Sequence, residues 1–364
     1  MTTTPTANAG RPPSATVFPE RLNLVRSRLD RELEAWLRER RTALGRTSPE
    51  AAELVDEVGR LVAGGGKRLR PALLLLAHEA CGGSDDGLAL RLGLAVELLH
   101  TYLLIHDDIM DQARTRRAHA TTHAAFADRH RLQGRRGDPA HFGRSVAILA
   151  GDLAHTWAVE LSREAPEPAA RAFDAMCEEV IGGQYLEMLL PHRREPGEAE
   201  LLRALRLKSG RYSVERPVEL GALLAGADPR IVAGLRSWGE AAGEAFQLRD
   251  DVLGTFGDAG AVGKPVASDL AEGKFTFLVF HALAGAAPED REWLLGALGR
   301  EDLTPDDLER ARSVMRGSGG LAAVEGMIRE RLERARRALD EVPLPAPARE
   351  PFLGFLVYLE ERDR

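Results

Sequence analysis

Three carboxylates interrupt an apolar, helix-forming stretch of this 364-residue chain, between Ile105 and Asp111. Asp107 and Asp111 are four residues apart, so on a helix they lie one above the other on one face, with Asp108 next to them. Like charges placed in this way repel one another unless a cation lies between them. Oxygen ligands with open positions suit Mg²⁺, which keeps waters and binds a ligand's phosphates. The spacing therefore predicts a magnesium site.

A second acidic pair, Asp250 and Asp251, lies in another apolar, helix-forming segment much further along the chain. Burying an unpaired charge costs free energy, so carboxylates within apolar segments indicate a function. We expect the two acidic segments to face each other across a pocket.

Cationic residues accompany both acidic segments, at glycine-rich turns or near helix ends. They are Lys67 and Arg70 within residues 64–71, Arg116 and Arg117 after the first acidic run, and Lys208, Lys264 and Lys274. Guanidinium groups bind phosphate with two hydrogen bonds, and lysine binds it as a point charge. Each cation alone is equally typical of a solvated surface. Together, acids ringed by cations have the layout for two diphosphates, one bound through metal and one bound directly.

The role of two polar residues on apolar helical segments is open to two interpretations. His100 lies seven residues before Asp107 on the same face, and Gln184 interrupts an apolar helix. Either residue could bind a ligand or satisfy a hydrogen bond within the core.

The elements that must position these residues are predicted to be helices throughout. Leu, Ala, Arg and Glu dominate almost every long segment from Pro19 onward, and β-branched runs are scarce. The expected helices cover residues 19–42, 48–63, 70–82, 87–113, 140–163, 168–190, 198–226, 229–255, 271–286, 288–298, 304–316, 319–341 and 348–361. The polar residues 114–143 are expected to form a long connection, and residues 1–16 a disordered tail. Residues 17–364 would then form a single-domain, all-α helical bundle with a central apolar cavity.

The amino-acid composition argues against several classes of partner and site. A net charge of −7 argues against nucleic acid as a partner. Two cysteines make a disulfide framework or a cysteine-based zinc site unexpected. No apolar run of about 20 residues and no secretory signal is recognised, so we expect no integral membrane segment and a cytoplasmic location.

From about residue 61 to residue 278 the chain resembles the trans-isoprenyl diphosphate synthases, also called polyprenyl synthetases. The matching motifs are GGGKRLRP at 64–71, ELLHTYLLIHDDIMD at 97–111, RR at 116–117, AILAGD at 147–152, GGQYLE at 182–187, KSGRYS at 208–213, FQLRDD at 246–251 and GKPVASDLAEGK at 263–274. The resemblance implies an all-α, homodimeric, Mg²⁺-dependent prenyltransferase. Such an enzyme joins isopentenyl diphosphate to an allylic diphosphate (dimethylallyl, geranyl or farnesyl diphosphate).

The resemblance also implies a role for each motif residue. Asp107, Asp111 and Asp250 would be the metal ligands, with Asp108 supporting them and Lys208 and Lys264 completing the catalytic set. Arg116, Lys208, Gln247, Lys264 and Lys274 would contact the allylic diphosphate, and Gln184 and Asp251 would line the substrate site. Lys67, Arg70, His100 and Arg117 would hold isopentenyl diphosphate.

The chain departs from the family pattern at a few positions. Gly254 stands where a third aspartate is usual, Ala118 where glycine is usual, and Glu187 where aspartate is common. Gly254 matters most, because it removes a carboxylate from the second acidic site. We expect an active enzyme with altered metal affinity.

Product length is expected to depend on Tyr102 and Leu103, which lie about one turn before Asp107. A growing chain that passes Asp107 must meet this level, and the bulk of Tyr102 favours a short product. The style of the second acidic motif is similar to that of geranylgeranyl diphosphate synthases, so C20 is favoured over C15. Two alternatives remain: a class I terpene cyclase, and a non-catalytic subunit of a heteromeric synthase.

Overall fold

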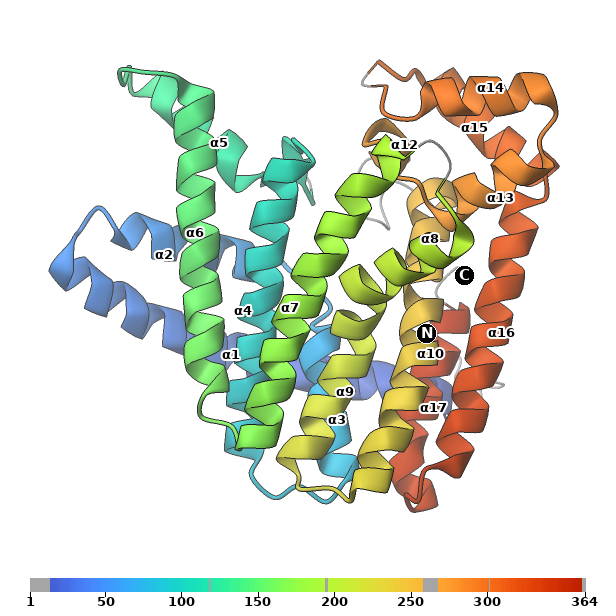
Figure 1. Ribbon diagram of the computed structural model, residues 1–364. Coiled ribbons are helices and arrows are strands. Elements are labelled where there is room, and N and C mark those ends of the chain that lie inside the picture. Colours follow the sequence, from blue (N-terminus) through green and yellow to red (C-terminus); the bar gives the residue numbers. More distant parts are fainter. Residues whose placement is uncertain (1–13, 118, 194–195, 258–267, 301, 362–364) are drawn as a thin grey trace, which may run out of the picture.

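A computed structural model describes residues 14–117, 119–193, 196–257, 268–300 and 302–361, which are almost entirely helical (Figure 1). The all-α prediction is confirmed. The helices are α1 (Ser14–Thr47), α2 (Ala52–Ala63), α3 (Leu69–Ala80), α4 (Asp86–Met110), α5 (Thr122–Leu132), α6 (Pro139–Ser162), α7 (Glu167–Leu189), η1 (Leu190–His192), α8 (Glu198–Leu205), η2 (Arg206–Glu215), α9 (Arg216–Leu224), α10 (Pro229–Phe256), α12 (Ser268–Ala271), α13 (Phe277–Gly285), α14 (Pro288–Ala297), α15 (Pro305–Gly317), α16 (Gly320–Glu341) and α17 (Ala346–Glu361). Two short antiparallel strands, β1 (Thr115–Arg116) and β2 (His119–Ala120), follow α4.

The long helices α4, α6, α7, α10 and α16 run roughly upright in Figure 1, and α1 crosses behind them. Two clusters of buried apolar side chains hold them together. One is built on α10, α13, α16 and α17 around Trp238, and the other on α4, α6 and α7 around Phe173. The bundle therefore has two separately packed halves.

The two helices that carry the acidic motifs both begin at an aspartate cap. The carboxylate of Asp85 accepts a hydrogen bond of 2.8 Å from the backbone N–H of Leu88 at the start of α4. Asp228 accepts one of 2.7 Å from Arg230 at the start of α10. Such caps satisfy backbone donors that a helix leaves unpaired at its first turn.

Residues 198–226 do not form the single helix that the sequence predicted. A π-helix, η2, separates α8 from α9. Glycines on two neighbouring helices let it pack closely, because a Cβ at Gly183 or Gly243 would overlap the backbone of Lys208 or Gly210. Wide helical turns of this kind occur often at functional sites.

Three further expectations need correction. The connection over residues 114–143 contains α5 and the two strands, and α6 begins within it at Pro139. The expected helix at 271–286 is replaced by α12 and by α13, which begins only at Phe277. A disordered tail was expected over residues 1–16, but helix α1 already begins at Ser14. Residues 1–13 lie outside the described residues.

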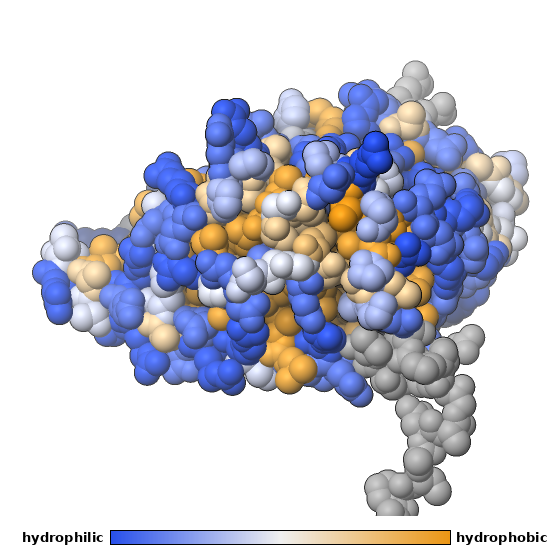
Figure 2. Space-filling view, turned by 90° about the horizontal axis from the view of Figure 1, so that it is seen from below, coloured by the Kyte–Doolittle hydropathy of each residue, from blue (hydrophilic) through white to orange (hydrophobic). Residues whose placement is uncertain are grey.

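By length and composition alone, one helix of the described chain, α4, could cross a membrane. In the fold, however, 67% of its apolar stretch is buried, as in a core helix of a globular protein. Viewed from below, hydrophilic side chains surround a more apolar middle of the surface (Figure 2).

Candidate active site

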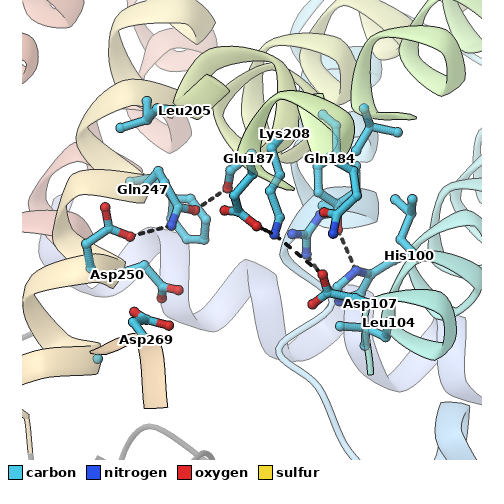
Figure 3. A pocket seen from close by; sticks show the side chains of 18 of the residues that line it. His100, Leu104, Asp107, Gln184, Glu187, Leu205, Lys208, Gln247, Asp250 and Asp269 are labelled. Atoms are coloured by element: carbon cyan, nitrogen blue, oxygen red, sulfur yellow. Dashed lines mark hydrogen bonds and ion pairs between the residues drawn. The ribbon is translucent and has the colours of Figure 1, made fainter. Parts of the chain in front are cut away.

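A cavity of about 960 Å³ opens between α4, α7, η2 and α10. Side chains of the two acidic motifs enter it from opposite sides, Asp107 from α4 and Asp250 from α10 (Figure 3). Lys208 and Glu187 lie between them. The expectation that the two acidic segments face each other across a pocket is confirmed.

The first acidic motif occupies the last turn of α4. Asp111 caps that helix, and Asp108 is buried beneath the motif. Arg116 of β1 donates to Asp108 with a 2.8 Å hydrogen bond and lies 3.7 Å from Asp107. Burial opposes charge on Arg116, but the hydrogen bond to Asp108 and the other acids raise its pKa. Arg116 therefore stays charged and fixes the two aspartates.

Two lysines neutralise the acidic motif from the other side of the cavity. Lys208 of η2 lies 3.4 Å from Asp107 and pairs with Glu187, while Lys274 lies 3.1 Å from Asp111. Burial lowers the pKa of both lysines, but the surrounding carboxylates outweigh this effect and raise it. The lysines are thus held as cations at the mouth of the acidic site.

The second acidic site is linked to η2 by a chain of hydrogen bonds. Ser209 donates to Gln247, which in turn donates to Asp251 at 2.7 Å. Burial, reinforced by Asp269 and Asp250, raises the pKa of Asp251 well above its usual range. The negative charges of these carboxylates oppose one another, and a bound cation would relieve this repulsion.

Gly254 has a carboxylate beside it after all. A Cβ at this position would lie 3.2 Å from Oδ2 of Asp269, which comes from α12 and lines the same cavity. Figure 3 places Asp269 next to Asp250. A residue from another element therefore occupies the space where the family's third aspartate would extend.

The donors of the two acidic sites fit Mg²⁺. Asp107 and Asp111 are stacked, and burial together with Asp107 raises the pKa of Asp111, with Lys274 opposing. Among the described residues, no group of three or more acidic, histidine or cysteine side chains is arranged to hold a metal ion. The stacked pair of carboxylates would therefore need water and substrate phosphates to complete the coordination of Mg²⁺.

The cations expected to bind the second diphosphate gather on the opposite wall. Arg70 donates to Ser213 at 2.8 Å, approaches Nε2 of His100 at 3.4 Å and lies over the ring of Tyr212. The Tyr212 hydroxyl lies 2.6 Å from Nδ1 of His100. Burial and nearby arginines hold the pKa of His100 well below its usual range, so its ring is neutral. A neutral histidine and a fixed arginine make a directional anion site.

The remaining cations of this wall are crowded against one another. Burial and the nearby positive charges of Arg116, Arg68 and Arg70 lower the pKa of Arg117. Glu97 opposes this shift but only partly offsets it. A Cβ at Gly66 would lie 3.6 Å from the guanidinium of Arg117, so the glycine loop and this arginine meet. Positive charge on Arg117 that neighbouring acids offset only in part favours an anionic ligand.

Most of the predicted site residues line this one cavity. The described members are Lys67, Arg70, His100, Tyr102, Leu103, Asp107, Arg116, Arg117, Gln184, Lys208, Gln247, Asp250, Asp251 and Lys274. Asp108 and Asp111 are not among the lining residues, although both contact side chains that are. Lys264 falls outside the described residues.

The polar cavity residues that were not predicted from sequence include Ser209, Tyr212, Asp269 and Tyr358. The first three lie within the quoted motifs at 208–213 and 263–274, so their position was a usable signal. Tyr358 has no such signal, because it comes from the last helix and meets Lys67 only in the fold, at 2.9 Å.

Comparison with known proteins gives consistent matches over most of the chain. The family model described as polyprenyl synthetase matches residues 52–315. Geranylfarnesyl diphosphate synthase of Aeropyrum pernix is 38% identical over 313 residues, which is 83% of this chain and 92% of that protein. Geranylgeranyl diphosphate synthase of Saccharolobus solfataricus is 32% identical and covers 81% of this chain and 86% of its own. The crystal structure of a Corynebacterium glutamicum geranylgeranyl pyrophosphate synthase, complexed with isoprenyl diphosphate and magnesium, matches with a TM-score of 0.87 at 32% identity, covering 95% and 99% of the two chains.

Proposed function

The chain belongs to the polyprenyl synthetase family, and we propose that it condenses isopentenyl diphosphate head-to-tail (1'-4) with an allylic diphosphate. One observation carries the proposal: a single cavity is lined both by carboxylates from α4 and α10 and by clustered arginines. Such a cavity can hold two diphosphates that would repel each other in solution. Bringing them together contributes much of the rate.

The residues of the acidic wall would bind and ionise the allylic substrate. Asp107, Asp111 and Asp250 would hold Mg²⁺, which when bound supplies positive charge for the departing diphosphate. Lys208 and Lys274 add fixed positive charge where the leaving group develops its own negative charge. The apolar walls of the cavity exclude water, which would otherwise quench the allylic cation.

The residues of the arginine wall would orient the second substrate. Lys67, Arg70 and Arg117 would hold the diphosphate of isopentenyl diphosphate, with neutral His100 as a directional partner. Its double bond attacks the allylic cation, and a proton is then lost. The released diphosphate, retained beside the new bond, is the proposed base, so no side chain is needed for this step.

We propose that the product is a short all-trans prenyl diphosphate, C20 in preference to C15. Relatives of similar identity are named for C20 and for C25 products, so their names do not decide the length. Tyr102 and Leu103 line the cavity about one helical turn before Asp107 on α4, and this supports their role as a length gauge. Burying each added isoprene unit in the cavity is favourable by roughly 4 kcal/mol, so only a rigid obstacle stops the prenyl chain from growing.

We propose further that the protein acts as a homodimer in the cytoplasm. Six of the nine large apolar side chains that are exposed in the described part of the chain lie on α4, α6 and α7. They are Ile148 and Leu149 on α6, together with Met110, Ile181, Tyr185 and Met188, which also line the cavity. Exposed apolar side chains concentrated on neighbouring helices are typical of a protein interface, and most homomeric interfaces are twofold.

Incubation with Mg²⁺, isopentenyl diphosphate and each allylic primer, with products sized by chromatography, tests the proposal. We expect a prenyl diphosphate that forms only when both substrates are present. A terpene cyclase would consume the allylic substrate alone, and a non-catalytic subunit would consume neither.

The acidic motif is tested in the same assay. Asp107→Ala and Asp111→Ala should each lower turnover by orders of magnitude with an unchanged circular dichroism spectrum, because each removes a proposed metal ligand. Near-normal turnover of either variant at saturating Mg²⁺ would contradict the assignment. Exposed Asp152 provides a matched control, because Asp152→Ala removes a carboxylate outside the proposed metal set.

A further inference from the structure

The π-helix η2 supplies side chains to two different parts of the cavity. Lys208, near the start of η2, reaches the acidic motif of α4. Near the other end of η2, the hydroxyl of Tyr212 lies 2.6 Å from Nδ1 of His100. Ser213 accepts a 2.8 Å hydrogen bond from Arg70. One short element therefore joins the acidic part of the cavity to the arginine-lined part, and its conformation sets the distance between them.

The conformation of η2 needs support from outside the helix. Hydrogen bonds between residues i and i+5 are rare and usually last for a single turn, whereas η2 spans the ten residues Arg206–Glu215. A shift of one residue toward α-helical register would rotate the side chains that follow by about 100°, because an α-helix has 3.6 residues per turn. Such a shift would turn Lys208 or Tyr212 away from its partner in the cavity.

A buried carboxylate on α10 holds the start of η2. Glu244 is 1% exposed and accepts a 2.8 Å hydrogen bond from Arg206, the first residue of η2. Arg331 and Arg334 of α16 each donate to the same carboxylate at 3.0 Å. Burial opposes the charge of Glu244, but the three arginines outweigh this effect and lower its pKa. A charged group therefore fixes this end of η2, although Glu244 is not among the residues that line the cavity.

A second carboxylate, on α7, holds the other end of η2. Arg211 donates to Glu179 at 2.7 Å. Arg216, which directly follows η2, donates to both oxygens of Glu179, at 2.6 and 2.9 Å. Burial raises the pKa of Glu179, but the two arginines outweigh this effect and lower it, so the carboxylate is charged. Like Glu244, Glu179 does not line the cavity. The two ends of η2 are thus tied by ion pairs to two different helices.

We propose that η2 is a rigid spacer that sets the distance between the two diphosphates, and that Glu244 and Glu179 are positioning residues for its opposite ends. Glu244 holds the end that carries Lys208, which faces the allylic diphosphate in the proposed reaction. Glu179 holds the end that carries Tyr212, which faces isopentenyl diphosphate through His100. The inference rests on the proposed prenyl transfer, and it assigns a different substrate to each of two residues that touch neither.

Steady-state kinetics with each substrate varied in turn tests this assignment. Glu244→Ala should raise the KM for the allylic diphosphate about tenfold and that for isopentenyl diphosphate less than about twofold, because the loss of one hydrogen bond to a charged group is felt at one end of η2. Glu179→Ala should have the reverse effect on the two KM values. Glu178→Ala is the matched control, since Glu178 is the exposed neighbour of Glu179 on α7, and it should change neither. A purely structural role would lower the melting temperature without separating the two KM values.

Glutamine variants decide the case in which an alanine variant fails to fold. Glu244→Gln and Glu179→Gln keep an acceptor oxygen for the arginines and lose only the charge, so each should shift the same KM as its alanine counterpart, by a smaller factor. Variants that melt near the wild-type temperature and raise both KM values equally, or neither, would overturn the inference. A wild-type protein that forms no prenyl product from isopentenyl diphosphate and farnesyl diphosphate with Mg²⁺ would instead overturn the proposed function, and the inference with it.

Discussion

Gly254 is the residue at which this chain departs most from its family, and the structure shows a neighbour that can compensate. Asp269 from α12 reaches the space beside it, with Oδ2 at 3.2 Å from where a Cβ would lie. We predict that Asp269→Asn raises the Mg²⁺ concentration for half-maximal rate by about tenfold, as for other outer partners of a metal site. Magnesium titration of the rate checks this, alongside direct Mn²⁺ binding in the presence of an allylic diphosphate.

Restoring the carboxylate at position 254 is the control for this prediction. Gly254→Asp alone should bring no gain, because its carboxylate would crowd Asp269. The double variant Gly254→Asp with Asp269→Gly should recover part of the lost affinity. A lower Mg²⁺ requirement in the Gly254→Asp variant alone would show that Asp269 does not take the place of the missing aspartate.

Among individual residues, the sequence predicted the charged side chains within motifs. It did not predict side chains that reach the site from segments outside the motifs. Asp107 and Asp250 could be recognised because carboxylates are conspicuous in apolar helices. Tyr358 could not, because a tyrosine near a chain end has no pattern that links it to Lys67. Arg68, which lies between Lys67 and Arg70 in the same motif, has a different role, because its guanidinium is buried against Glu97 at 2.6 Å.

The loop before α3 is anchored to the bundle by this buried arginine. Arg68 has a left-handed backbone with φ 52° and pairs with Glu97 of α4 and with Asp30 of α1. We predict that Glu97→Ala lowers the free energy of unfolding by about 3–5 kcal/mol, because it leaves a buried cation poorly paired. Urea unfolding followed by circular dichroism measures the loss.

A surface ion pair provides the comparison for Glu97. Glu79 pairs with Arg21, and both side chains are largely exposed. Glu79→Ala should change the free energy of unfolding by less than about 1 kcal/mol. Equal effects of the two substitutions would mean that the Arg68 pair does not anchor the loop.

The last helix, α17, contributes to the arginine wall through Tyr358. Its hydroxyl accepts a 2.9 Å hydrogen bond from Lys67, and its ring packs on Phe18 and Phe355. We predict that Tyr358→Phe raises the KM for isopentenyl diphosphate roughly fivefold, since it removes about 1 kcal/mol of hydrogen bonding that orients the lysine. Steady-state kinetics with each substrate varied in turn checks this. An equal rise in the KM for the allylic substrate would contradict a role on this wall alone.

Helices were easier to predict than their interruptions. Leu- and Ala-rich periodicity indicated the long segments of the bundle, because packing reinforces what local propensity favours. The π-helix η2 could not be predicted in this way, because its wide turns depend on Gly183 and Gly243 from neighbouring helices. The same turns direct Lys208, Ser209 and Tyr212 into one cavity, so the missed element is also the one that organises the site.

For the molecule as a whole, the sequence indicated one helical bundle with two acidic helices facing a pocket. What it could not indicate is the arrangement of the two packed halves around that pocket. The π-helix η2 packs against α10 at Gly243, and the arginine wall joins the loop after α2 to the last helix. Both are contacts between segments distant in sequence, which local patterns do not encode.

The exposed apolar face on α4, α6 and α7 leads to the last prediction, which concerns assembly. Leu149 is 55% exposed on this face, whereas Leu24, at 65%, is exposed on α1 outside it. We predict that the wild-type protein has twice the 39.7 kDa mass of the chain in light scattering, and that Leu149→Asp yields a monomer because burying an unpaired carboxylate in the interface is costly. Leu24→Asp introduces the same charge on a comparably exposed leucine and should leave the dimer intact. A monomeric wild type, or a dimer that Leu24→Asp dissociates and Leu149→Asp does not, would show that the apolar face is not the dimer interface.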